Sequence, residues 1–304
     1  MNPQTTRILA PTDFSPAADR ATRRAASVAA TLGGTLQLAH VLPPRDVLEQ
    51  LYLRRPPSEL AAFHSRAQQA LQERAQYIAK RYAVAAVCEL YSGPAHQAIL
   101  EASTSLGATL LVLGARGEHE GVSPSQTVGE TALKLAEQSR AAALLVRREA
   151  EQPYGHVVGC AKAVPADRSV IDWAQRLSPA DLIHIVSAYT VPYESRLREW
   201  GASQEMLNTY AEREREERSR RLSALLIEFG LPAARARLHV EHGDALATVL
   251  QHAAQWQADV LVVGRRAQAS PLTAGRFGSI ARHIAYLATT DVMIVPPPPA
   301  AETK

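Results

Sequence analysis

An aspartate that follows an apolar segment is the first residue in this chain whose position could support chemistry. Asp13 comes after Ile8-Leu9-Ala10 and before Ser15-Pro16, which reads as a helix N-cap and the first helical residue. A carboxylate at the end of a buried strand can accept hydrogen bonds from a ribose hydroxyl or a base amine. Aspartate is equally common there as a cap or turn residue, so both interpretations stay open.

Glycines follow another apolar segment, residues 110–113. Gly114 comes directly after it and Gly117 three positions later, and eleven further residues precede Gly129, where a helical pattern begins. Glycine lets the backbone approach a ligand closely, and the N–H groups at a helix start favour an anion. The location at a strand end therefore indicates a loop that could bind phosphate.

Other motifs that would carry chemistry are missing from the sequence. There is no Gly-Lys dipeptide, which excludes the usual phosphate loop of the triphosphatases, and there is no GxSxG nucleophile elbow. The segment 239–242 lacks the HExxH spacing of zinc sites. His40 and His184 lie in apolar runs and are predicted to be packed, hydrogen-bonded residues. The sequence therefore predicts no catalytic residue and no metal site.

The chain contains an internal repeat. Gly264 follows Gly114 by 150 residues, and Gly278, with Ser279 beside it, follows Gly129 by 149. Self-similarity at a fixed offset indicates copies of one structural unit. Two copies that divide near residue 150 predict two domains, 1–150 and 151–304.

Each copy alternates short apolar strands with segments of helical length. The strands expected in the first copy span about 7–11, 35–41, 84–91, 109–114 and 142–147. The helices expected include 16–32, 58–82 and, as the counterpart of the latter in the second copy, 195–229. Wholly apolar strands are typical of a parallel sheet covered on both faces. The pattern predicts an α/β fold of two tandem, doubly wound, parallel five-stranded sheets, which bind ligands beyond the carboxyl ends of their strands.

Composition and charge exclude several classes of protein. The 304 residues include 33 Lys and Arg against 30 Asp and Glu, a net charge of +3, and no basic block is present, so nucleic acid is not an expected partner. No apolar run reaches the roughly 18 residues of a membrane helix, and the first residues do not form a signal peptide. The expectation is a soluble globular protein of the cytoplasm with no membrane partner.

The residues described so far resemble those of the universal stress protein family, over nearly the whole chain and as two tandem domains. Residues 8–15 are similar to that family's first strand with its aspartate, and residues 38–41 to the end of its second strand. ATP-binding members carry G-x2-G-x9-G-[ST], in which the loop and the hydroxyl residue hold the phosphates. The resemblance implies Rossmann-like, adenine-nucleotide alpha-hydrolase-like domains in a stress-response or regulatory protein that binds ATP or AMP, with Mg²⁺ beside ATP left open.

The nucleotide-binding residues that this resemblance implies are Pro11, Thr12, Asp13, Val41, Gly114, Gly117, Gly129, Gly264, Gly278 and Ser279.

Each copy departs from the family pattern. In the first, eleven residues rather than nine precede the last glycine, and Glu130 replaces the hydroxyl residue, where a carboxylate should repel a phosphate. In the second, Ala267 replaces the second glycine, ten residues intervene, and Lys162 stands opposite Asp13. The first copy thus keeps the adenosine-side aspartate, and the second keeps the better phosphate end.

Three functions are compatible with these residues. The first is an adenine-nucleotide-binding stress protein, with a site in at least one half. The second is a tandem scaffold of the same fold that acts by association with an unidentified protein. The third is an enzyme that cleaves or transfers adenylate, which is disfavoured because no general base or nucleophile is visible, although weak ATP hydrolysis by positioning alone stays open.

The resemblance also implies how the copies associate. Universal stress domains commonly pair through their last strands, here the apolar segments 143–146 and 292–295. We therefore expect the two sheets to pack as a pseudo-twofold pair within one chain. Association of two chains into a homodimer stays open.

Overall fold

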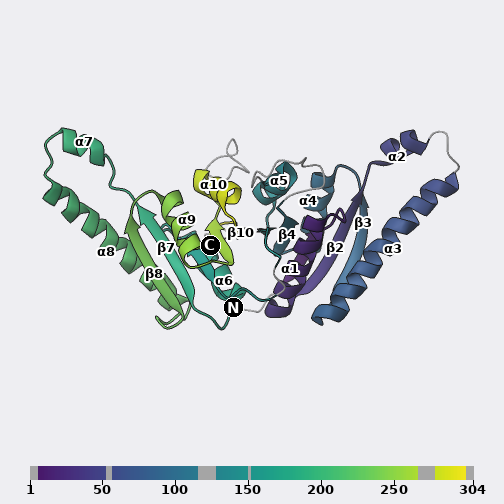
Figure 1. Ribbon diagram of the computed structural model, residues 1–304, viewed down its shortest axis with the longest axis horizontal. Coiled ribbons are helices and arrows are strands. Elements are labelled where there is room, and N and C mark those ends of the chain that lie inside the picture. The colour runs from purple at the N-terminus through teal and green to yellow at the C-terminus, as the bar shows by residue number, and fades with distance from the viewer. Residues whose placement is uncertain (1–5, 53–56, 116–127, 150–151, 266–277, 299–304) are drawn as a thin grey trace, which may run out of the picture. The chain divides into compact units, whose positions relative to one another are not determined.

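A computed structural model of the chain describes residues 6–52, 57–115, 128–149, 152–265 and 278–298. The chain folds into two compact units, Met1–Pro153 and Tyr154–Lys304. Each unit is an α/β domain in which helices cover a sheet of parallel strands, as Figure 1 shows. This architecture confirms the predicted fold class. The pairing of the two copies through 143–146 and 292–295 stays a prediction.

In unit 1 the strand order is β3-β2-β1-β4-β5, and the neighbouring strands are parallel. The strands are β1 (Arg7–Pro11), β2 (Thr35–Leu42), β3 (Ala86–Ser92), β4 (Leu110–Gly114) and β5 (Ala142–Val146). The helices are α1 (Pro16–Leu32), α2 (Arg45–Tyr52), α3 (Pro57–Tyr82), α4 (Ala95–Leu106) and α5 (Glu130–Gln138). The order reverses between β1 and β4, so the carboxyl ends of these strands flank the switch point at which doubly wound sheets bind ligands.

Helices lie on both faces of the unit 1 sheet. α1 contacts β1 and β4 and packs on α3, whereas α4 contacts β1 and β2 and packs on α5. Right-handed crossovers that lead in opposite directions along a sheet place their helices on opposite faces, which explains the two pairs. The strands between them form the core: Ile8, Leu9, Leu110 and Leu111 are fully buried.

Local signals in the sequence set the position of α1 beside the switch point. The Ala18 N–H donates to Ser15 Oγ at 3.2 Å, Pro16 is the first helical residue, and Gly33 ends the helix with φ 59°. These three features confirm the predicted bounds of the helix. Gly114 lets α1 approach β4 closely, because a Cβ there would lie 3.0 Å from the carbonyl carbon and oxygen of Ala17.

Unit 2 repeats this arrangement, with the strand order β10-β9-β6-β7-β8. The strands are β6 (Val157–Cys160), β7 (Ile183–Tyr189), β8 (Ala236–His242), β9 (Val260–Gly264) and β10 (Asp291–Val295). The helices are α6 (Asp167–Leu177), α7 (Glu194–Glu199), α8 (Gln204–Glu228), α9 (Ala245–Gln255) and α10 (Ser279–Leu287). None of the described helices is long and apolar enough to cross a membrane.

The predicted helix at 195–229 is wrong as a continuous element, because α7 and α8 are separate helices. Gly201 adopts φ 90°, a conformation that ends a helix at low cost for glycine. Ser203 then caps α8, since its Oγ accepts the N–H of Met206 at 3.2 Å. The sequence analysis missed this break because the charged residues that follow, 212–218, have strong helical spacing.

Candidate functional site

A pocket of about 520 Å³ opens at the carboxyl ends of β1, β2 and β4 in unit 1. Pockets of this size hold small organic ligands, and a few polar groups usually orient the ligand between apolar walls. Here the polar groups come from the β1–α1 turn and from the start of α5. The described lining residues are Pro11, Thr12, Asp13, Ser15, Ala18, Ala39, His40, Val41, Ala95, Ile99, Leu113, Gly114, Gly129, Glu130, Thr131, Ala132 and Leu135.

The pocket brings together the residues that the sequence singled out in the first copy. Pro11, Thr12 and Asp13 lie at the end of β1, Val41 lies near the end of β2, and the two glycines, Gly114 and Gly129, lie at the end of β4 and the start of α5. Gly117 is outside the described residues.

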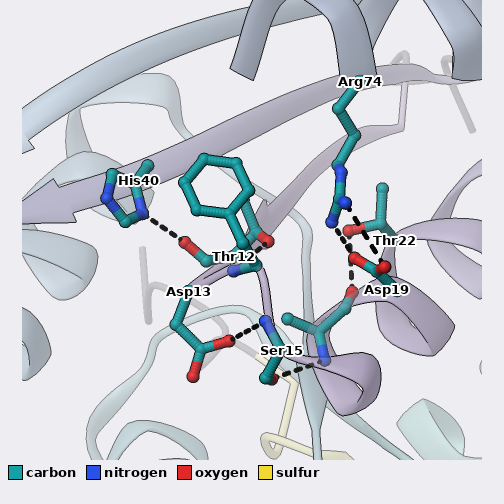
Figure 2. A network of polar contacts seen from close by, with 9 residues as sticks. Thr12, Asp13, Ser15, Asp19, Thr22, His40 and Arg74 are labelled. Carbon is teal, nitrogen blue, oxygen red and sulfur yellow. Dashed lines mark hydrogen bonds and ion pairs between the residues drawn. The ribbon is translucent and has the colours of Figure 1, made fainter. Parts of the chain in front are cut away.

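The β1–α1 turn presents the carboxylate of Asp13. Its Oδ1 accepts the N–H of Ser15 at 3.0 Å, while Oδ2 has no partner among the described residues, and the side chain is exposed (Figure 2). The Phe14 N–H donates to Thr12 Oγ1 at 3.0 Å, so the short side chains of the turn satisfy its backbone amides. Asp13 is therefore a turn residue that keeps one oxygen available to a ligand.

Phe14 holds this turn in an uncommon backbone conformation. Its φ is 64°, in the left-handed region that a residue with a Cβ seldom adopts, at a cost of about 1 to 2 kcal/mol. Such strain persists only where the surrounding structure fixes it, and it is frequent at binding sites. The left-handed residue lies between the two pocket residues Asp13 and Ser15.

A chain of polar and aromatic contacts surrounds the Phe14 ring. The ring lies against the imidazole of His40, with centroids 4.5 Å apart, and the Arg74 guanidinium is 5.4 Å from the ring centroid. Arg74 forms an ion pair with Asp19 on α1, with Nη2 3.3 Å from Oδ2. His40 Nδ1 is 2.7 Å from the Thr12 carbonyl oxygen, which confirms the prediction of a packed, hydrogen-bonded residue (Figure 2). The turn is thus held from β2, α1 and α3.

The amino end of α5 provides the second polar side of the pocket. Gly129 is the N-cap and has no side chain, so no cap hydrogen bond occupies the N–H groups of the first turn. These N–H groups and the helix dipole favour an anion. Glu130 points its carboxylate to Lys134, with Oε1 2.7 Å from Nζ, and this ion pair lowers the pKa of Glu130 below its usual value. Lys134 therefore partly offsets the negative charge that Glu130 adds beside the pocket.

Sequence reasoning missed several residues of the pocket. Thr131 supplies a hydroxyl group one position after the place where the family pattern expects it. Ala95 and Ile99 contribute an apolar wall from the start of α4. The signal for this wall was Gly93-Pro94 after the third strand, which brings a helix start to the carboxyl edge of the sheet.

Unit 2 fills the corresponding turn with one of its own carboxylates. Asp167 is 4% exposed, and its Oδ2 accepts the N–H groups of Lys162 at 2.9 Å and Val164 at 2.8 Å. Burial raises the pKa of Asp167, and the backbone hydrogen bonds oppose that shift. Ala163, which corresponds to Phe14, is also left-handed, with φ 61°. The same turn conformation therefore recurs, but the carboxylate that accepts its amides is the buried Asp167 of α6 rather than a residue of the turn itself.

The other predicted residues of the second copy lie at equivalent elements. Gly264 ends β9, Gly278 is the N-cap of α10 without a side-chain cap, and Ser279 is the first residue of α10. Ala267 is outside the described residues. The exposed side chain of Lys162 stands where unit 1 has Asp13.

A separate cluster of histidines lies in unit 2, around Trp256. His184 Nδ1 on β7 is 3.1 Å from His239 Nε2 on β8, which confirms that His184 is hydrogen-bonded. Both rings lie against the indole, with centroid distances of 4.3 and 4.5 Å, and His252 stacks on it at 4.2 Å. Among the residues that the structure describes, no group of side chains is arranged to hold a metal ion.

Comparisons with known proteins agree with this architecture. The universal stress protein family profile matches residues 4–147 and 153–296. A universal stress protein from Archaeoglobus fulgidus DSM 4304 has a similar structure, with a TM-score of 0.69 and 14% identity over 96% of this chain and 99% of that one. A putative universal stress protein from Pseudomonas aeruginosa UCBPP-PA14 has a TM-score of 0.63 and 18% identity over 97% and 94%. No curated protein sequence matches the chain. The two matches to the family profile cover most of the sequence, and the chain therefore belongs to the universal stress protein family.

Proposed function

We propose that this universal stress protein binds an adenine nucleotide, ATP or AMP, in the pocket of unit 1 and acts as a nucleotide-dependent regulatory protein. The observation that carries the proposal is the pocket itself. It places an available carboxylate oxygen of Asp13 and the uncapped start of α5 at the carboxyl edge of one sheet, beside its switch point.

The two polar sides of the pocket suit the two ends of a nucleotide. Asp13 can accept a hydrogen bond from a ribose hydroxyl or from the adenine amine, and Val41 and Ile99 offer apolar surface to the base. The first-turn N–H groups of α5 and the hydroxyl group of Thr131 can donate to phosphate oxygens. The site would hold Mg²⁺ through the phosphates of ATP rather than through described protein ligands.

Binding rather than catalysis is the function that these contacts support. In the described part of the pocket, the Ser15 hydroxyl oxygen caps α1 and His40 Nδ1 engages the Thr12 carbonyl oxygen. No described pocket residue pairs a nucleophile with a general base, which nucleotide hydrolysis by a covalent route would require.

The contrast between the two units supports a site in unit 1. In unit 2 the amide groups of the β6–α6 turn already donate to Asp167, and Lys162 replaces the carboxylate that would accept from the ligand. Unit 2 therefore lacks, on this turn, the acceptor that Asp13 Oδ2 offers to a ribose hydroxyl or an adenine amine in unit 1. We therefore expect one nucleotide per chain.

Lys134 should govern preference among nucleotides, because it neutralises Glu130 beside the phosphate end. Lys134→Ala leaves the Glu130 carboxylate without its partner, and we expect ATP affinity to fall about threefold to tenfold while AMP affinity changes less. Glu130→Gln in the same background should restore ATP binding. Titration calorimetry with both nucleotides measures the ratio of their affinities, and an equal loss for ATP and AMP would contradict a role of Lys134 in nucleotide preference.

The direct test of the proposed function is titration calorimetry on nucleotide-stripped protein with ATP, AMP and, for comparison, GMP. Saturable binding of an adenine nucleotide with a stoichiometry near one is expected. If neither ATP nor AMP at millimolar concentration gives heat or a thermal shift, the proposal is wrong and association with a protein partner becomes the leading function.

A further inference from the structure

We propose that Arg74, on α3, is a positioning residue for the unit 1 pocket: with Asp19 and the ring of Phe14 it holds the turn from Thr12 to Ser15 in the conformation that forms the pocket wall. The inference rests on the proposed nucleotide site and names a residue outside the pocket that controls its affinity.

The geometry places Arg74 behind the pocket wall rather than in it. Neither Phe14 nor Arg74 lines the pocket, whereas Thr12, Asp13 and Ser15 do. The centroid of the Phe14 ring lies 4.5 Å from that of His40 and 5.4 Å from the Arg74 guanidinium carbon. Any effect of Arg74 on a ligand must therefore pass through the ring and the turn that carries it.

Each partner of the ring is itself fixed by a second contact. Asp19, on the first turns of α1, pairs with the Arg74 guanidinium, which prevents the long arginine side chain from leaving the ring. His40 is fixed from β2 by its contact of 2.7 Å with the Thr12 carbonyl oxygen. A cation over an aromatic face is attracted by the ring electrons, and partial burial strengthens that attraction. These contacts stabilise a backbone conformation that Phe14 would otherwise seldom adopt.

The second unit shows what the same turn requires without an aromatic clamp. Ala163 has nearly the same φ as Phe14, 61° against 64°, but it has no ring. There the carboxylate of Asp167 holds the turn from inside by accepting its amide N–H groups. In unit 1 Thr12 Oγ1 and Asp13 Oδ1 accept turn amides, and Phe14 and Arg74 add a second support from outside, while Asp13 Oδ2 stays free to meet a ligand. Contacts of Phe14 with His40 and Arg74 therefore support the turn without occupying the pocket.

The experiment combines affinity with hydrogen exchange of the turn. Arg74→Met removes the charge and keeps most of the stem, Arg74→Lys keeps a cation that can pair with Asp19, and Phe14→Leu removes the aromatic face. The matched control is Arg218→Met, because Arg218 lies 5.6 Å from the centroid of the Tyr189 ring and donates to the Lys162 carbonyl oxygen in unit 2. Exchange is followed by mass spectrometry in nucleotide-free protein on peptides that cover 11–18, with 160–167 as the internal reference.

We expect Arg74→Met and Phe14→Leu each to weaken AMP binding by about fivefold and to speed exchange in 11–18 but not in 160–167. Arg74→Lys should recover part of both losses, and Arg218→Met should change neither. The double variant of Arg74 and Phe14 should lose no more than Phe14→Leu alone, because Arg74 acts on the turn through that ring.

Each contrary result contradicts a different statement. If Arg74→Met and Phe14→Leu leave hydrogen exchange in 11–18 unchanged, then Arg74 and the Phe14 ring do not hold the turn, whether or not nucleotide binds. Faster exchange with unchanged AMP affinity would overturn the positioning role alone. A wild-type protein that binds neither ATP nor AMP would overturn the proposed function, and the positioning role with it, while the exchange data would still report on the clamp.

Discussion

Asp13→Ala is expected to lower the affinity for AMP and ATP by about tenfold to a hundredfold, the effect of losing a hydrogen bond to a charged group in a partly desolvated site. The variant removes both uses of the carboxylate, because Oδ1 also accepts the Ser15 N–H. Titration calorimetry measures the loss. Lys162→Ala, at the equivalent position of unit 2, is the matched control and should leave affinity unchanged.

Asp13→Asn separates the ligand role of Asp13 from its turn role. The asparagine oxygen can still accept the Ser15 N–H, so the turn keeps its shape while the negative charge and the second acceptor are lost. We expect an affinity between those of the wild type and Asp13→Ala. If Asp13→Asn binds as tightly as wild type while Asp13→Ala does not, Asp13 acts through the turn alone and makes no contact with the nucleotide.

Unit 2 should lose stability as the pH falls below about 6.5, because of the histidines around Trp256. Burial lowers the pKa of His184 and of His239, and the positive charges of Arg237 and of the neighbouring histidines lower both further, although Glu241 opposes this at His239. The unfolded chain then binds more protons than the folded one between the folded pKa values and the ordinary value of about 6.5. Stability is therefore fully present above that value and declines as acidity increases.

The unfolding free energy should fall between pH 7.5 and 5.5, by less than the full linkage slope of two histidines because both rings are partly exposed. Urea unfolding followed by tryptophan fluorescence reports on unit 2 selectively, since Trp173, Trp200 and Trp256 all lie there. The His184→Gln, His239→Gln double variant should flatten the pH dependence. The exposed His283 of α10 provides the control, because His283→Gln should leave the pH dependence of stability unchanged. An equal slope in the double variant and the wild type would contradict this account.

The sequence predicted those parts of the fold that depend on local patterns. Apolar strands, the Ser15 cap and the end of α1 at residue 32 each have a short-range physical cause, and each is found where it was expected. The sequence did not predict the break between α7 and α8. Gly201 and Ser203 are isolated within a long segment of residues that favour helix, so the segment as a whole still has a helical pattern. The repeat offset located Lys162 opposite Asp13, which the structure places on corresponding turns.

The site could be located from the sequence, but its internal contacts could not. Strand ends and a helix start placed Asp13, Gly114 and Gly129 at one edge of the sheet. By contrast, Phe14 and Arg74 are sixty residues apart in the sequence, and no local sequence pattern predicts the contact between them. Asp167 reads in the sequence as an ordinary first-turn acid of a helix, and only its burial against the turn amides shows that it occupies them.

The central claim is that unit 1, and not unit 2, holds the nucleotide. A crystal structure of the full chain grown with AMP tests it most directly. The account predicts AMP in the unit 1 pocket, with its phosphate at the N–H groups that begin α5 and the Asp13 carboxylate on the ribose or the adenine. AMP bound in unit 2 beside Lys162 and Asp167, with the unit 1 pocket empty, would contradict it.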